Sequence, residues 1–278
     1  MRDPRKRLAS AAVTDPALAI DRVFELEPHG PDTFLGESPA YPWGRIYGGL
    51  VIAQALWAAT QTVRPEHAVH SLHAYFILGG DLGEPVRYEV DRVRNGRSFT
   101  TRRVLARQSG GAILTLACSF QRSEEGAETQ TSTFPPGVPA PDDSAIEPDA
   151  GIDRIDLTKD RSSPRSRIWA RFPVALPDDP RIHACALAYM SDENAMDAVW
   201  KSHPIDPERE DAESMGASLD HAVWFLRPVR ATDWNLIDMT SHGIVGSRGL
   251  ATGPVFGRDG THVATIAQEG LLRVRRKP

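Results

Sequence analysis

The stretch IHACALAYMSDENAMDAVW, residues 182–200, decides how the rest of this chain is arranged. From residue 182 to residue 190 the sole polar side chain is His183, so a helix here would be hydrophobic on nearly every side and would lie inside the protein. The next four residues, SDEN, interrupt the apolar run and would take Asp192 into the interior. An ionised carboxylate is costly to bury without partners. Asp192 is therefore either a structural residue held by hydrogen bonds or an acid retained for its chemistry.

The composition is that of an ordinary globular protein. The 278 residues are 41% hydrophobic and 25% charged, and the formal net charge is -5, which argues against a nucleic-acid partner. A chain of this length forms one large domain or two fused ones. Cys118 and Cys185 are the two cysteines, too few for a disulfide framework or a cysteine-based metal site.

Nothing in the sequence indicates export or membrane insertion. The N-terminal stretch MRDPRKRLASAAVTDP lacks the apolar run of a secretory signal, and no stretch is long and apolar enough to cross a bilayer. Together with the sparse cysteines, this predicts a cytoplasmic protein.

The two halves of the chain carry similar elements. In the first half, an apolar run at 50–59 predicts a buried helix beginning after Gly48 and Gly49. A hairpin is expected before it at 24–26 and 33–35, and strands after it at 70–78, 86–93, 99–107 and 112–121. In the second half, the helix at 182–200 is expected among strands at 167–172, 217–225, 234–242, 248–256 and 262–274. Residues 122–164 are polar and proline-rich and predict a linker, or an excursion with short helices of its own.

An internal repeat relates the two halves. HAYF at His73 resembles HAVWF at His221, and the turns ending at Gly111 and Gly260 are 149 residues apart (260 − 111). A nearly constant offset across two strands and a turn indicates a duplication. At the offset of 149, Gln268 falls on Ser119.

Each half therefore predicts a hotdog-like α+β unit, in which antiparallel strands wrap around one long helix. The expected fold is a double hotdog, with both sheets joined into one continuous sheet and both helices on its concave face. The predicted parts are an N-terminal unit at 1–121, a linker at 122–164 and a C-terminal unit at 165–278. The first helix has no acid, so we expect the C-terminal unit to carry the chemistry and the N-terminal unit to serve as scaffold and wall.

Six segments in order resemble the TesB type of acyl-CoA thioesterase II, a family of fused double-hotdog enzymes. They are GGLVIAQAL, VHSLHAYF, VRNGRSFTTRRV, YMSDEN, SLDHAVWFLRP and ATIAQEG. The resemblance implies hydrolysis of fatty acyl-CoA to free fatty acid and CoA, by an Asp, a Thr or Ser and a Gln that hold a water. These residues fall on Asp192, Ser218 and Gln268. Two positions depart from the usual pattern: Ser218 stands where Thr is frequent, and Leu50 where Gln is common.

This chemistry suits the residue types. A thioester carbonyl is electrophilic, so a water oriented and partly deprotonated by Asp192 can attack it without a covalent nucleophile. A hydroxyl and a carboxamide both donate and accept hydrogen bonds, and can fix that water. Backbone N–H groups at the start of the first helix, at Gly49 and Leu50, are candidates to stabilise the oxyanion. No metal or redox cofactor is expected.

Other interpretations remain open at this point. Asp192 can instead be a helix cap, as single polar interruptions often are. Asp220 and His221 are adjacent in a predicted strand and so point to opposite faces, and His73 recurs at the repeat position of His221, which favours a structural histidine. An enoyl-CoA hydratase and a non-catalytic protein that binds acyl-CoA are the alternative functions. Acyl-CoA is the expected ligand in each case, and we expect a homodimer or higher homo-oligomer.

Overall fold

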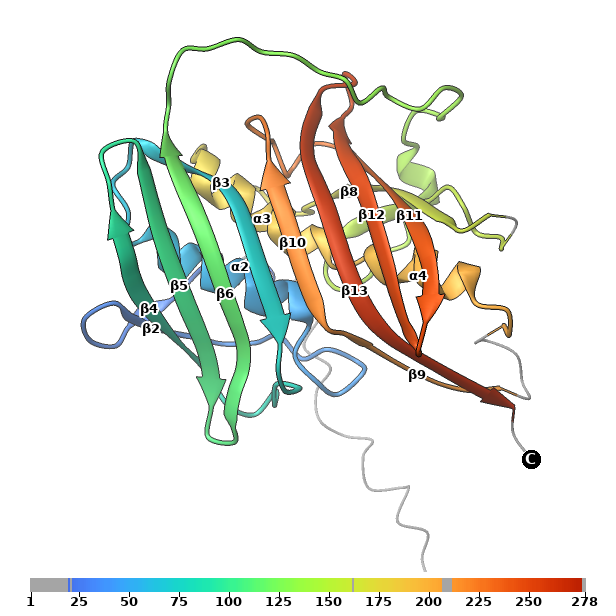
Figure 1. Ribbon diagram of the computed structural model, residues 1–278, viewed down its shortest axis with the longest axis horizontal. Helices are drawn as coiled ribbons and strands as arrows, with labels where there is room; N and C mark the ends of the chain where they lie inside the picture. The colour runs from blue at the N-terminus through green and yellow to red at the C-terminus, as the bar shows by residue number, and fades with distance from the viewer. Residues whose placement is uncertain (1–19, 21, 162, 207–211, 277–278) are drawn as a thin grey trace, which may run out of the picture.

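The computed structural model describes residues 20, 22–161, 163–206 and 212–276. Within these residues, thirteen strands form one antiparallel sheet in the order β1-β2-β4-β5-β6-β3-β10-β13-β12-β11-β8-β7, with β9 paired to β13. Figure 1 shows the helices α2 and α3 side by side against one face of this sheet. The predicted double hotdog with a continuous sheet is confirmed.

Most strands lie where the sequence predicts them, but the first strand of the N-terminal hairpin lies at 27–28 and not at 24–26, and β7 was not predicted. Those of the first half are β1 (Glu27–Pro28), β2 (Thr33–Gly36), β3 (His67–Phe76), β4 (Val86–Asn95), β5 (Phe99–Gln108) and β6 (Gly111–Arg122). Those of the second half are β7 (Asp153–Asp156), β8 (Arg165–Arg171), β9 (Ala212–Ser218), β10 (Asp220–Phe225), β11 (Asn235–Val245), β12 (Arg248–Gly257) and β13 (His262–Arg276). The two halves meet where β3 pairs with β10, from Ser71 opposite Trp224 to Tyr75 opposite Asp220.

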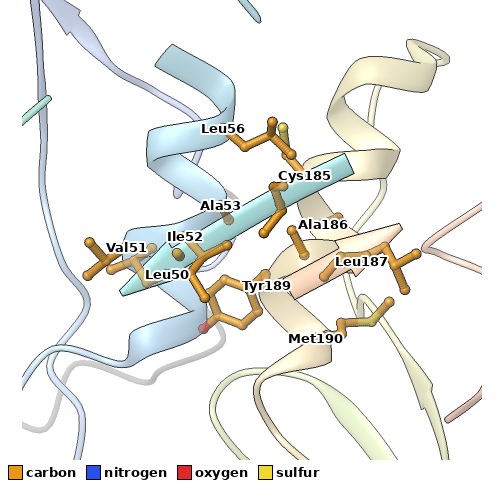
Figure 2. Close-up of a cluster of buried hydrophobic side chains, with 14 of the residues drawn as sticks. Leu50, Val51, Ile52, Ala53, Leu56, Cys185, Ala186, Leu187, Tyr189 and Met190 are labelled. Carbon is orange, nitrogen blue, oxygen red and sulfur yellow. The ribbon is translucent and has the colours of Figure 1, made fainter. Parts of the chain in front are cut away.

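Two apolar helices fill the space under the sheet. Helix α2 (Gly48–Thr60) and helix α3 (Pro180–Ser191) bury nearly every side chain, as their composition predicts. Figure 2 shows their aliphatic side chains meeting between them. A Cβ atom on Gly49 would lie 2.3 Å from the backbone oxygen of Tyr189, so glycine at this position permits the start of α2 to approach the end of α3.

The prediction of one helix at 182–200 is wrong, because the helix breaks after Ser191. A second helix, α4 (Ala195–Ser202), begins four residues later and packs against β8, β11, β12 and β13. The break is held by Asn194, whose buried amide donates to the backbone oxygens of Ser166 and Ile237 at 3.1 and 3.3 Å. Polar bonds to the sheet replace one turn of helix there, and Asp192 lies at that turn.

The predicted linker is partly structured. Its last part contains a short 3-10 helix, η2 (Asp143–Ala145), and β7, which pairs with β8 at the edge of the sheet. The indole nitrogen of Trp169 in β8 donates to the backbone oxygen of Pro139 at 2.9 Å. The end of the predicted linker thus belongs to the sheet of the second half.

The repeat is real, but its register shifts by one residue in the second hairpin. The inward side chains of β6 include Leu116 and Cys118, and those of β13 include Ile266 and Gln268. Two residues separate β5 from β6, whereas four separate β12 from β13. Gln268 therefore corresponds to inward-facing Cys118, and its alignment with Ser119 is wrong, since Ser119 faces outward and bonds to His70.

Among the residues that the structure describes, no helix has the length and apolar character needed to cross a membrane.

Candidate active site

The three residues predicted from the sequence lie together. The amide nitrogen of Gln268 donates to Asp192 Oδ1 at 3.0 Å and to Ser218 Oγ at 2.7 Å. The hydroxyl of Ser218 lies 3.4 Å from Asp192 Oδ1, a long hydrogen bond. The end of α3, the end of β9 and the middle of β13 thus meet at one point.

Each residue reaches this point for a local reason. Asp192 is the residue that ends α3. The predicted strand at 217–225 is divided at Leu219 into β9 and β10, and Ser218 is the last residue of β9, opposite Gly270 of β13. Gln268 lies two residues before Gly270 on the same strand and faces the interior, with 0% of its surface exposed.

The two carboxylate oxygens of Asp192 have different surroundings. Oδ1 receives both hydrogen bonds from the neighbouring side chains. Oδ2 has no such bond from any residue that the structure describes, and it lies 2.6 Å from the position that a Cβ atom on Gly48 would take. The free oxygen of the carboxylate therefore faces the first residue of α2.

A pocket of about 430 Å³ opens beside this group. Both halves of the chain line it: Ser218, Asp192 and Glu193 come from the second half, and aromatic and aliphatic side chains come from the first. The apolar wall includes Trp43, Ile46, Tyr47, Val51, Phe76 and Ile113. The aromatic side chains of the lining belong to the first half, whereas Asp192 and Glu193 belong to the second.

The residue of α2 that lines the pocket is the one just before the two predicted oxyanion donors. Gly48 lines the pocket, whereas Gly49 and Leu50 are buried behind it and are not part of the lining. All three belong to the first turn of α2, where backbone N–H groups lack acceptors within the helix. Sequence reasoning missed Gly48, although the glycine pair marked the position.

Comparison with known proteins identifies the family. Two family models match, "Acyl-CoA thioesterase N-terminal domain" over residues 38–121 and "Acyl-CoA thioesterase" over residues 144–271. Acyl-coenzyme A thioesterase 8 from Homo sapiens is 32% identical over 98% of this chain and 92% of its own. The chain belongs to the acyl-CoA thioesterase family.

Other members have the same architecture. Acyl-CoA thioesterase 2 from Haemophilus influenzae is 33% identical over 86% of this chain and 92% of its own. The crystal structure of an acyl-CoA thioesterase II TesB2 from Mycobacterium marinum is 36% identical, with a TM-score of 0.77 over 92% of this chain and 98% of that one. The resemblance to TesB-type thioesterases is confirmed.

In this thioesterase, His221 lies behind Asp192, Ser218 and Gln268. Its Nδ1 atom is 2.6 Å from Gln268 Oε1, and its Nε2 atom is 2.7 Å from Ser191 Oγ. Asp220 does not contact it and instead accepts from the backbone N–H of Glu269, so the two neighbours point to opposite faces as predicted. Burial lowers the pKa of His221, and the nearby Asp192 opposes this effect.

The repeat position that His73 and His221 share in the sequence does not give them similar surroundings. His73 is exposed on the outer face of the sheet, pairs in register with Ala222, and has its ring edge-on to Trp224. His221 is 1% exposed and faces inward. The two histidines thus have no common environment.

A buried acidic group lies beside the pocket and was not predicted. Glu193 contacts Arg154, with Oε1 2.8 Å from Nη1. Burial raises the pKa of Glu193 to about 8, with Asp149 acting in the same direction and the Arg154 guanidinium opposing both. The sequence signal for this group was present in the SDEN interruption, where Glu193 directly follows Asp192.

Proposed function

We propose that this protein hydrolyses fatty acyl-CoA to free fatty acid and CoA, with Asp192 as the general base for a water held by Ser218 and Gln268. The single observation that supports this most is the convergence of the three side chains beside a pocket with an apolar wall. An apolar wall suits an acyl chain, and a carboxylate with one unoccupied oxygen suits proton abstraction from water.

The proposed base atom is Asp192 Oδ2. Because Oδ1 is engaged by the amide of Gln268, Oδ2 is the oxygen available to the proton of a water. The hydroxyl of Ser218 makes a long bond to the carboxylate and can turn its proton toward that water instead. The water oxygen attacks the thioester carbonyl as Oδ2 takes its proton. The C–S bond then breaks, and the proton passes to the leaving thiolate of CoA.

The carbonyl oxygen becomes negative during the attack and needs hydrogen-bond donors. The first-turn N–H groups of α2 are suitable donors, since they lack intrahelical acceptors and lie at the positive end of the helix dipole. We assign this role to the start of α2, at Gly48 together with Gly49 and Leu50. The place of Gly48 in the pocket lining supports this assignment.

The test is release of CoA thiol from a panel of acyl-CoAs by Asp192→Asn. This change keeps the size of the side chain and an acceptor for Ser218, and removes the base. We expect kcat to fall by roughly 10²- to 10⁴-fold, the range typical of a general base. Asp179→Asn is the matched control, because Asp179 caps the opposite end of the same helix and Asn caps equally well.

Other outcomes would point elsewhere. Undiminished thiol release by Asp192→Asn would remove the proposed base. Formation of 3-hydroxyacyl-CoA from an enoyl-CoA, without free thiol, would indicate a hydratase. Tight binding of acyl-CoA by the parent protein without any product would indicate a non-catalytic binding protein. The cytoplasmic location and the homo-oligomeric state stay predictions.

A further inference from the structure

A chain of buried polar side chains runs away from the pocket behind Gln268. It passes from the amide of Gln268 to the imidazole of His221 and ends at the hydroxyl of Ser191, the last residue of α3. All three residues are at most 1% exposed. None of these contacts is needed to close the sheet or the helix, so their role has to be sought in the side chains that they orient.

The orientation of the Gln268 amide decides whether the site is assembled. Its nitrogen faces Asp192 Oδ1 and Ser218 Oγ, and its oxygen faces His221. A carboxylate can only accept hydrogen bonds. If the amide were turned over, its oxygen would face the carboxylate oxygen, and the two would repel each other. Something on the far side must therefore hold the amide oxygen.

His221 can hold the oxygen only when Nδ1 carries a proton. The 2.6 Å contact to Oε1 joins two acceptors if Nδ1 is bare, which would favour the turned-over amide. Because burial lowers the pKa of His221, the ring is neutral near pH 7 and carries one proton. That proton belongs on Nδ1.

Ser191 supplies the complementary contact. With the ring proton on Nδ1, Nε2 is an acceptor, and the Ser191 hydroxyl 2.7 Å away can donate to it. The same hydroxyl lies 2.8 Å from the backbone oxygen of Ala188, which is its alternative acceptor. Donation to Nε2 selects the tautomer that holds Gln268.

We propose that His221 is a positioning residue whose Nδ1 proton fixes the Gln268 amide for its contacts with Asp192 and Ser218, and that Ser191 selects this tautomer. This inference rests on the proposed function of the three site residues. His221 acts through Gln268 and touches no reacting atom.

The first experiment compares His221→Asn with His221→Leu. The two replacements have nearly the same shape, and Asn has an amide nitrogen close to the position of Nδ1, whereas Leu has no donor. We expect the Leu variant to lose roughly 10- to 100-fold in kcat with KM changed by less than threefold, as a misplaced catalytic group would cause. The Asn variant should keep kcat within about fivefold of the parent value, because it retains a donor close to the position of Nδ1. Equal losses in both variants, or an unchanged Leu variant, would overturn the proposal.

The second experiment does not depend on activity, and its readout is taken from the parent protein. Heteronuclear NMR of the imidazole nitrogens in the parent protein should show His221 protonated on Nδ1, the signal being assigned by its absence in His221→Asn. A proton on Nε2 alone would overturn the proposal. Because this readout is independent of turnover, a failure of the proposed catalytic base, seen as undiminished thiol release by Asp192→Asn, is distinguished from a failure of the tautomer.

Ser191→Ala tests the last hydrogen bond in the series from Gln268 through His221 to Ser191. We expect a mixture of tautomers at His221 and a fall in kcat that the control Ser202→Ala does not show. Ser202 makes the same type of bond near the end of α4, from Oγ to the backbone oxygen of Val199. An unchanged tautomer in Ser191→Ala would remove Ser191 from the proposal.

Discussion

Asp192 Oδ2 lies 2.6 Å from the position that a Cβ atom on Gly48 would occupy, so the carboxylate of one half of the chain rests against the first helical residue of the other. The ring of Phe76 is almost as close, 2.8 Å from the same position. Because glycine has no side chain, position 48 leaves room for the carboxylate and for a molecule that approaches its free oxygen. The contact joins the two predicted units at the site itself.

Gly48→Ala should impair catalysis more than folding. The added methyl group would push the carboxylate and the Phe76 ring, both of which are movable side chains, away from their positions. We expect kcat/KM for acyl-CoA to fall by roughly 10- to 100-fold, because a displacement of about 1 Å is that costly to a reacting group. Gly110→Ala is the control, since a Cβ atom there would have nothing within 4 Å. Equal activity in the two variants would contradict the close packing at Gly48.

At position 218, the hydroxyl group should matter more to activity than the small size of the serine side chain. Ser218→Ala removes the acceptor for the Gln268 amide and the donor to the water, and one lost hydrogen bond of about 1 kcal/mol lowers kcat by roughly fivefold or more. Ser218→Thr keeps the hydroxyl and should retain most of the activity. Steady-state thiol release measures both. A Thr variant as slow as the Ala variant would show that space, and not the hydroxyl, limits this position.

Glu193 should make stability depend on pH. Its pKa is about 8 in the folded protein, against an ordinary value of 4.5. Between these values the unfolded chain has lost a proton that the folded chain keeps, so the free energy of unfolding falls as pH rises, by at most about 1.4 kcal/mol per pH unit. Glu193→Gln does not titrate, and its stability relative to the parent should increase from pH 5 to pH 8.

Urea unfolding at several pH values measures this difference. Asp197, whose pKa burial also raises, contributes to the same trend and is unchanged in both proteins. Exposed Glu27→Gln serves as the control. A stability difference between Glu193→Gln and the parent that stays constant with pH would mean that Glu193 is already ionised in the folded state.

Neither cysteine should react in the folded protein. Cys118 and Cys185 are 2% and 0% exposed, and burial raises the pKa of both thiols, so little reactive thiolate forms. We expect an aromatic disulfide reagent to detect no thiol before denaturation and both thiols after it. Fast labelling of the native protein would show that the packing between α2 and α3 opens. The prediction also implies that a thiol-release assay has no background from the enzyme.

Most of the strands could be predicted from local patterns, and the meeting of Asp192, Ser218 and Gln268 could be predicted from segments that match the family. It did not predict the break between α3 and α4. The residues on both sides of the break are apolar, and the bonds that end the helix join Asn194 to Ser166 and Ile237, which are 28 and 43 residues away. A pattern within the helix has no information on such partners.

The alignment of the second repeat on the first was wrong for a different reason. The turn glycines Gly111 and Gly260 align in the sequence, but the second hairpin connection is longer, and the strand that follows it is shifted by one residue. Because side chains alternate between the faces of a strand, a shift of one residue exchanges inward and outward positions. Gln268 was therefore matched to an outward serine, and the buried chain through His221 could not be anticipated.

The pairing of β3 with β10 joins residues near 72 to residues near 223, and no hairpin connects these strands. Contacts between such distant parts of a chain form slowly, because the loop between them must be ordered first. Each half has its own hairpins and can collapse earlier. We therefore expect the junction to be among the last parts to form during refolding. Since the pocket has walls from both halves, enzymatic activity should return later than the circular dichroism of the sheet.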